Sequence, residues 1–265
     1  MKNIKIMFID LDGTLMNNNK EISKYTSGVF KKITDRGIHT VICSGRTNIY
    51  SIEKSKIVNA SNIVISSNGS LIYDYLNNIK IYESEINMEE LQSFHTFSIQ
   101  NNIACIYNSV SKRFRNKNSD KAEAIVFENV DEIDDTVSQI VAYTTEFKNV
   151  ELIENYIYNN EVLEVCNCSN SVVKKDSMAS KYSFDIGLKG TTKGNAIKIL
   201  LDYLGIDKND AICFGDHVND YSMFEACGYK VAMQNGMDEL KEKADFIAES
   251  NDEDGVAKFI EKNIL

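Results

Sequence analysis

Short apolar runs and longer amphipathic stretches alternate along the first part of the chain. Residues 4–9 form an apolar run that ends at Asp10, and residues 22–33 then place their apolar side chains on one helical stripe, closed by Gly37. Residues 39–44 and 62–66 repeat the pattern of a buried strand, with a helical stretch between them. Alternating strands and helices predict a parallel sheet covered on both faces.

This alternation stops near residue 70 and resumes after Gly190. Residues 70–73 and 80–82 flank Asn77-Asn78 and predict a hairpin. Beyond it we expect helices over 88–100 and 150–158, and strands near 103–107, 124–127, 138–143, 162–166 and 184–188. A helix over 197–204, strands at 211–214, 229–232 and 245–247, and a final helix from residue 255 complete the chain.

The predicted fold class is therefore α/β, with a doubly wound, mostly parallel, Rossmann-like sheet and an inserted α+β domain. We expect residues 1–82 and 182–265 to form the doubly wound core. Residues 83–181 would form the insert.

Composition narrows the classes of function. Hydrophobic residues make up 43% and charged residues 26% of the 265 positions, as in ordinary folded proteins. The 29 Lys and Arg against 39 Asp and Glu leave a net charge of −10, which argues against binding to nucleic acid or to an anionic membrane surface. The opening residues do not form a signal-peptide core, and no long apolar stretch follows, so we expect a cytoplasmic protein.

Polar residues follow several of the predicted strands at their carboxyl ends, where open parallel sheets bind ligands. Lys193 lies near the start of the helix that follows the insert. The strand-end segments are Asp10-Leu-Asp12-Gly13-Thr14, Ser44-Gly45-Arg46, Ser67-Asn68-Gly69 and Gly215-Asp216-His217-Val218-Asn219-Asp220.

These residue types favour phosphoryl transfer if the strands bring them together. Clustered carboxylates repel one another unless a cation lies among them, and oxygen ligands select Mg²⁺ over softer metals. Lys193, the Ser44 hydroxyl and backbone amides after a strand are suited to hold phosphate oxygens.

Each segment also has an ordinary structural explanation. Asp12-Gly13 is a common turn, and Lys193 alone could be a solvated residue in the first turn of a helix. Asp216 and Asp220 could cap the helix that starts near residue 221. The four segments in this order, each at a strand end, are far more specific than any one of them.

Together the motifs resemble the haloacid dehalogenase superfamily, specifically the Cof-type, sugar-phosphatase-like enzymes with a large type IIB α/β cap. The resemblance covers nearly the whole chain and includes Ser67-Asn68-Gly69 and the segment from Asn251 to Ala257. The four core motifs are similar to Phe8-Ile-Asp10-Leu-Asp12-Gly-Thr14, Cys43-Ser44-Gly45-Arg46, Thr192-Lys193-Gly194 and Gly215-Asp216-x-x-Asn219-Asp220.

The resemblance implies a role for each of these residues. Asp10 would be the nucleophile that forms an aspartyl-phosphate, and Asp12 the general acid and base. Mg²⁺ would be held by Asp10, by the backbone carbonyl of Asp12 and by Asp216, with Asp220 as a ligand or a neighbour of the ligands. The substrate and its phosphate would contact Thr14, Ser44, Gly45, Arg46, Lys193 and Asn219.

The roles of two side chains, Arg46 and His217, stay open. Arg46 could contact the substrate or the cap, or it could form a structural ion pair. His217 could point at the substrate, but an exposed loop histidine needs no special role, and we expect it to point outward.

The resulting hypothesis is a Mg²⁺-dependent phosphatase that hydrolyses phosphate monoesters of small metabolites through an aspartyl-phosphate. Sugar phosphates are favoured as substrates, with pyridoxal or nucleotide-type phosphates as alternatives. We expect a monomer or homodimer whose partner is a small phosphorylated metabolite, with no nucleic-acid or membrane partner. Two other hypotheses stay open, namely a phosphomutase and a non-catalytic regulatory or binding protein of the same fold.

Overall fold

The protein divides into two compact units, described here from a computed structural model of residues 3–174 and 177–265. The first unit comprises Met1–Tyr82 and Thr192–Leu265, and the second comprises Glu83–Thr191. The boundary expected at residue 181 falls inside a long strand, Ser177–Leu188, that pairs within the second unit. Within the described residues, every helix is too short or too polar to cross a bilayer.

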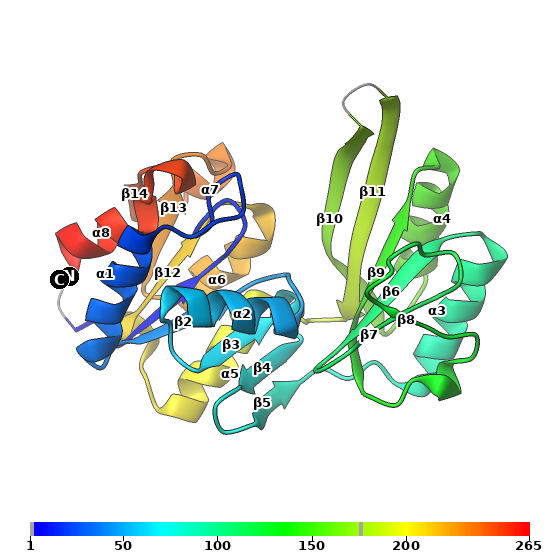
Figure 1. Cartoon of the computed structure of the whole chain (residues 1–265), viewed down its shortest axis with the longest axis horizontal. Coiled ribbons are helices and arrows are strands. Elements are labelled where there is room, and N and C mark those ends of the chain that lie inside the picture. The colour runs from blue at the N-terminus through cyan, green and yellow to red at the C-terminus, as the bar shows by residue number, and fades with distance from the viewer. Residues whose placement is uncertain (1–2, 175–176) are drawn as a thin grey trace. The chain divides into compact units, whose positions relative to one another are not determined.

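The first unit is built on an eight-stranded sheet in the order β14-β13-β12-β1-β2-β3-β4-β5 (Figure 1). Neighbouring strands from β14 to β3 run parallel, whereas β4 is antiparallel to β3. Its strands are β1 (Ile6–Ile9), β2 (His39–Cys43), β3 (Ile63–Ser66), β4 (Leu71–Asp74), β5 (Ile79–Glu83), β12 (Ala211–Gly215), β13 (Tyr229–Met233) and β14 (Phe246–Ala248).

Helices cover both faces of this sheet, as the continuous apolar strands require. Side chains of β1 alternate between two clusters, with Met7 and Ile9 in one and Ile6 and Phe8 in the other. The first cluster includes α1 (Lys24–Asp35), α2 (Asn48–Val58) and α8 (Gly255–Asn263); the second includes α5 (Lys193–Leu204), α6 (Tyr221–Ala226) and α7 (Asp238–Lys241). The predicted doubly wound sheet is therefore confirmed.

Strand β1 lies at the point where the chain order of the sheet reverses. It pairs in parallel with β12 on one side and β2 on the other, and Ile9 is in register with both Phe214 and Ile42. Residues that follow these three strands therefore leave the sheet at the same edge. Ligands of open α/β sheets bind at such a reversal.

The second unit has a six-stranded sheet in the order β10-β11-β9-β6-β7-β8. The sequence pattern did not reveal β7, and β10 and β11 are longer than predicted. Most neighbours are antiparallel, but β7 and β8 are parallel. The elements are α3 (Met88–Gln100), β6 (Ala104–Ser109), β7 (Arg113–Arg115), β8 (Ile125–Val126), β9 (Val137–Thr144), α4 (Phe147–Tyr158), β10 (Leu163–Lys174) and β11 (Ser177–Leu188).

Candidate active site

Asp10 follows the last residue of β1 and lies at the reversal point of the sheet. Its side chain is nearly buried, with 5% of the residue exposed. The chain then turns sharply at Gly13, whose φ is +79°. A Cβ at this position would lie 2.2 Å from Asp216 Oδ2, so both the conformation and the close approach require glycine.

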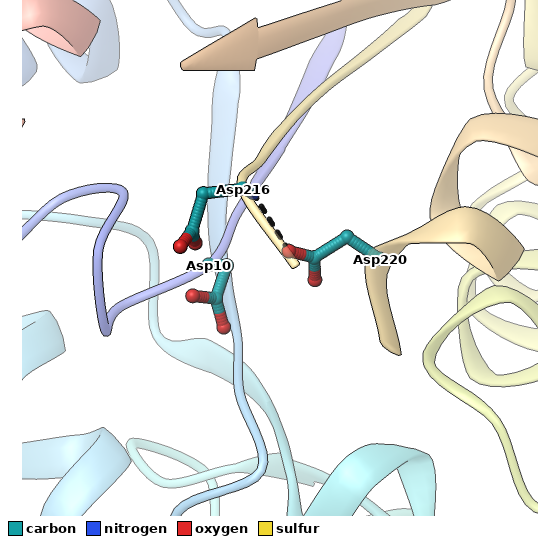
Figure 2. A group of neighbouring side chains, drawn as sticks. All are labelled: Asp10, Asp216 and Asp220. Carbon is teal, nitrogen blue, oxygen red and sulfur yellow. Dashed lines mark hydrogen bonds between the residues drawn. The ribbon is translucent and has the colours of Figure 1, made fainter. Parts of the chain in front are cut away.

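Two further carboxylates come from the segment after β12. Asp216 follows the strand, and Asp220 ends a 3₁₀ helix over Val218–Asp220. Asp220 Oδ2 accepts hydrogen bonds from the backbone amides of Asp216, at 2.9 Å, and His217, at 3.1 Å. Asp10, Asp216 and Asp220 each place one oxygen within 4.8 Å of the others, and Figure 2 shows the three side chains converging.

Lys193 supplies the positive charge of this group. It is the first residue of α5, and the side chain of the preceding Thr192 caps that helix by accepting from the backbone amide of Asn195. The Lys193 ammonium lies 2.6 Å from Asp10 Oδ1 and 2.7 Å from Asp220 Oδ1, and the residue is 1% exposed. A buried ammonium in this position is fixed by two charge-assisted hydrogen bonds.

The buried group carries more negative than positive charge. Three carboxylates face one ammonium, which leaves a surplus of two negative charges when all are ionised. Burial and the neighbouring carboxylates Asp220 and Asp216 raise the pKa of Asp10 to about 8, against the opposing effect of Lys193. Burial and Asp220 likewise raise the pKa of Asp216 to about 6.

The donor set fits a hard divalent cation. Its ligand atoms are carboxylate oxygens, and a double positive charge would neutralise the surplus. Both oxygens of Asp220 already accept from Lys193 or from backbone amides, which leaves Asp10 and Asp216 as the better placed ligands. Thr14 Oγ1 donates to Asp216 Oδ1 at 2.7 Å and so orients that carboxylate.

Asp12 lies in a different environment from Asp10. Its carboxylate pairs with two nitrogens of Arg46, at 2.7 and 2.8 Å, and with Lys20 Nζ at 2.7 Å. The side chain keeps 30% of its surface exposed. Burial would raise the pKa of Asp12, but the hydrogen bonds and charges of Arg46 and Lys20 outweigh it and lower the pKa to about 2.

The remaining predicted residues lie in the segments that follow β2 and β12, and Asn68, from the segment after β3, contacts both segments. Ser44 is buried, and its hydroxyl accepts from the backbone amide of Arg46 at 3.2 Å. Asn219 Nδ2 donates to Asn68 Oδ1 at 3.1 Å. A Cβ on Gly45 would come 2.8 Å from the same Asn68 oxygen, so the segments after β2, β3 and β12 meet here.

Several contacts were not assigned from the sequence. Lys20 lies in a turn, and no motif marked it as a partner of Asp12. Asn235 Nδ2 donates to the carbonyl of Gly13 at 2.8 Å, and Asn251 Nδ2 donates to the carbonyl of Met16 at 2.8 Å. Asn251 belongs to the segment from Asn251 to Ala257, which is part of the family resemblance, whereas no motif in the sequence pointed to Asn235. His217 is exposed, as expected.

The sequence matches the model of a known protein family over nearly its whole length. The family model for haloacid dehalogenase-like hydrolases matches residues 7–260. The chain belongs to this family. The family and its phosphatase members make the protein a hydrolase that acts as a phosphatase.

Two similar curated proteins from Bacillus subtilis bear the same name, 5-amino-6-(5-phospho-D-ribitylamino)uracil phosphatase. YcsE is 30% identical over 99% of this chain and 96% of its own length, and YwtE is 28% identical over 98% of each. Among solved structures, a haloacid dehalogenase-like hydrolase from Bacteroides thetaiotaomicron has a TM-score of 0.83 at 23% identity, covering 97% of this chain and 98% of its own. A subclass IIB sugar phosphatase has a TM-score of 0.74 at 22% identity, covering 97% and 98%.

Proposed function

We propose that this hydrolase cleaves phosphate monoesters of small hydroxylated metabolites, uses Mg²⁺, and forms a covalent acyl phosphate on Asp10. The observation that carries the proposal is the buried group of Asp10, Asp216 and Asp220 around Lys193. A carboxylate nucleophile needs its charge balanced before it can approach an anionic phosphate. The group provides one fixed cation and an oxygen donor set suited to a second.

In the first half-reaction an Asp10 oxygen attacks phosphorus, and the bond from phosphorus to the alcohol oxygen of the substrate breaks. Lys193, which contacts Asp10, lowers the repulsion between the carboxylate and the phosphate. Asp10 and Asp216 would hold Mg²⁺, which supplies further charge neutralisation when bound. Ser44 and Asn219 would orient the phosphoryl oxygens.

Asp12 would transfer protons in both half-reactions. In the second half-reaction water attacks phosphorus, and the bond from phosphorus to Asp10 breaks to release inorganic phosphate. Held by Arg46 and Lys20, Asp12 is a carboxylate at neutral pH, which is the form that takes the proton from this water. To protonate the leaving alkoxide in the first half-reaction, Asp12 must separate from these cations, which lower its pKa. Arg46 would then be free to contact the substrate.

The relatives support this class of substrate. The ribitylamino uracil phosphate in the name of the two Bacillus enzymes and a sugar phosphate share a phosphorylated polyol chain. We therefore propose that the physiological substrate carries its phosphate on such a chain, with sugar phosphates foremost.

The test is phosphate release by purified enzyme from sugar phosphates, 5-amino-6-(5-phospho-D-ribitylamino)uracil, pyridoxal phosphate and nucleotides, each with Mg²⁺ and with EDTA. We expect Mg²⁺-dependent release, with the highest kcat/KM for a polyol phosphate. Full activity in EDTA, with no bound metal by elemental analysis, would contradict the metal assignment. A preference for nucleotides would contradict the substrate class.

A further inference from the structure

The turn after β3 has an unusual backbone. Ser67, Asn68 and Gly69 have φ values of 51°, 56° and 101°, so three consecutive residues lie in the left-handed region. Serine has no particular tolerance for this conformation, whereas asparagine adopts it more readily than most residues. The whole turn is buried, so surrounding contacts must stabilise it.

The backbone of this turn contacts two segments of the candidate active site. The amide of Ser67 donates to the carbonyl of Arg46 at 2.8 Å, and the amide of Asn68 donates to the carbonyl of Ser44 at 3.1 Å. On its other side, a Cβ at Gly69 would lie 2.3 Å from the carbonyl oxygen of Thr192, the residue before Lys193. The turn therefore packs between the Ser44 loop and the start of α5.

The side chain of Asn68 adds a third contact. Its Oδ1 accepts a hydrogen bond from Asn219 Nδ2 at 3.1 Å, and it lies against Gly45. Asn68 is 2% exposed and Asn219 is half-buried, so the acceptor end of this bond is shielded from competing water.

We infer that Asn68 is a positioning residue that fixes the side-chain amide of Asn219 for binding a phosphoryl oxygen. The inference rests on the proposed function, in which Asn219 contacts the phosphate. A side-chain amide can rotate so that either its oxygen or its nitrogen faces a given neighbour. An oxygen facing the phosphate would repel it.

The hydrogen bond to Asn68 selects one of these two orientations. In the structure Asn68 presents its oxygen to Asn219, so the nitrogen of Asn219 faces Asn68, and the second N–H of that amide can point to the phosphate. The left-handed backbone of Asn68 places that oxygen beside both Gly45 and Asn219. The structure thus gives a physical reason for asparagine at position 68.

The experiment is a double-mutant cycle on the Mg²⁺-loaded enzyme. Asn68→Gly removes the amide but retains a residue that adopts a left-handed backbone, and Asn219→Ala removes the group it would orient. The readouts are KM for p-nitrophenyl phosphate, kcat, and the inhibition constant of inorganic phosphate. We expect Asn68→Gly to raise KM and the inhibition constant by about three- to tenfold, the usual effect of one hydrogen bond.

In the Asn219→Ala background, the same change should alter both constants less than about twofold, because the group on which Asn68 acts is absent. Equal factors in both backgrounds would overturn the inference and leave the proposed function intact. If Asn219→Ala alone leaves phosphate inhibition unchanged, the assigned phosphate contact of Asn219 fails, and this inference fails with it. Absence of phosphate release by the wild-type enzyme would instead contradict the proposed function.

Asn59→Gly is the matched control. Asn59 also has a left-handed φ, of 60°, but it ends α2 and donates to the carbonyl of Ser27. Asn59→Gly should therefore leave KM and the inhibition constant of inorganic phosphate unchanged. If Asn68→Gly does not fold, NMR of the wild-type Asn219 side-chain NH₂ replaces the cycle: phosphate should shift one of its two proton resonances far more than the other, and equal shifts would overturn the inference.

Discussion

Asp10 and Asp12 are two residues apart, yet the protein places them in opposite electrostatic environments. Asp10 is buried among carboxylates with one ammonium, and its pKa rises to about 8. Asp12 is partly exposed between Arg46 and Lys20, and its pKa falls to about 2. The region around Asp10 therefore has a surplus of negative charge that an additional cation would balance, whereas the carboxylate of Asp12 already pairs with two cations.

The largest expected effect comes from replacing the nucleophile. Asp10→Asn should abolish turnover, because the amide cannot form the acyl phosphate on which both half-reactions depend. Circular dichroism and thermal melting should show that the fold is retained. Turnover at the wild-type rate would show that another group attacks phosphorus.

The same substitution at Asp12, beside Arg46 and Lys20, should lower turnover less than it does at Asp10. Asp12→Asn leaves the nucleophile in place and removes proton transfer, so turnover should fall by roughly 10²- to 10⁴-fold. The loss should be smaller for p-nitrophenyl phosphate than for an alkyl phosphate, since the nitrophenolate leaves without protonation. Equal losses on the two substrates would contradict the acid role of Asp12.

The third prediction concerns stability without metal. The pKa values of Asp10 and Asp216 are about 8 and about 6 in the folded protein, against an ordinary value of 3.8. Folded protein therefore binds more protons than unfolded protein as pH rises from about 4 to about 8, and its stability should fall across that range. Thermal unfolding in EDTA measures this trend.

Mg²⁺ should counteract this loss of stability at higher pH, because it binds the deprotonated carboxylates. The Tm increase caused by Mg²⁺ should be larger at about pH 8 than at about pH 5, and Asp10→Asn should reduce the pH dependence measured in EDTA. A Mg²⁺ effect that is independent of pH would contradict the charge surplus assigned to this group.

The smallest expected effect concerns Lys20. Lys20→Met removes one of the two cations on Asp12, so the pKa of Asp12 should rise from about 2 toward 3.8. Carboxyl ¹³C NMR can follow this titration. The control is Lys31→Met, which removes an exposed pair with Asp35 in α1 and should leave the Asp12 titration unchanged.

The sequence allowed the prediction of the doubly wound sheet because its strands are continuous apolar runs and its site residues follow those runs. Asp10, Asp216 and Asp220 were expected to approach one another for that reason, and the structure brings them together with Lys193, which begins the helix after the insert. Strand β7 was missed because it has only three residues, Arg113–Arg115, and two of them are charged. Apolar periodicity carries no signal over so short a segment.

The partners of individual side chains were harder to predict. Lys20 reaches Asp12 across a turn, and Asn235 reaches Gly13 from a segment 222 positions away in sequence. Such contacts depend on where loops pack in space, which local periodicity does not encode. Arg46 was assigned to the substrate or the cap, or else to a structural ion pair, and the structure shows an ion pair with Asp12.

Trapping of the phosphoenzyme tests the central claim most directly. Enzyme quenched during turnover and treated with borohydride should carry a reduced residue at the site of the acyl phosphate, which peptide mass spectrometry can locate. The account predicts homoserine at position 10 in the wild type, also in Asp12→Asn, and no reduction in Asp10→Asn. Modification at another carboxylate, or rapid turnover with no trapped residue at position 10, would contradict it.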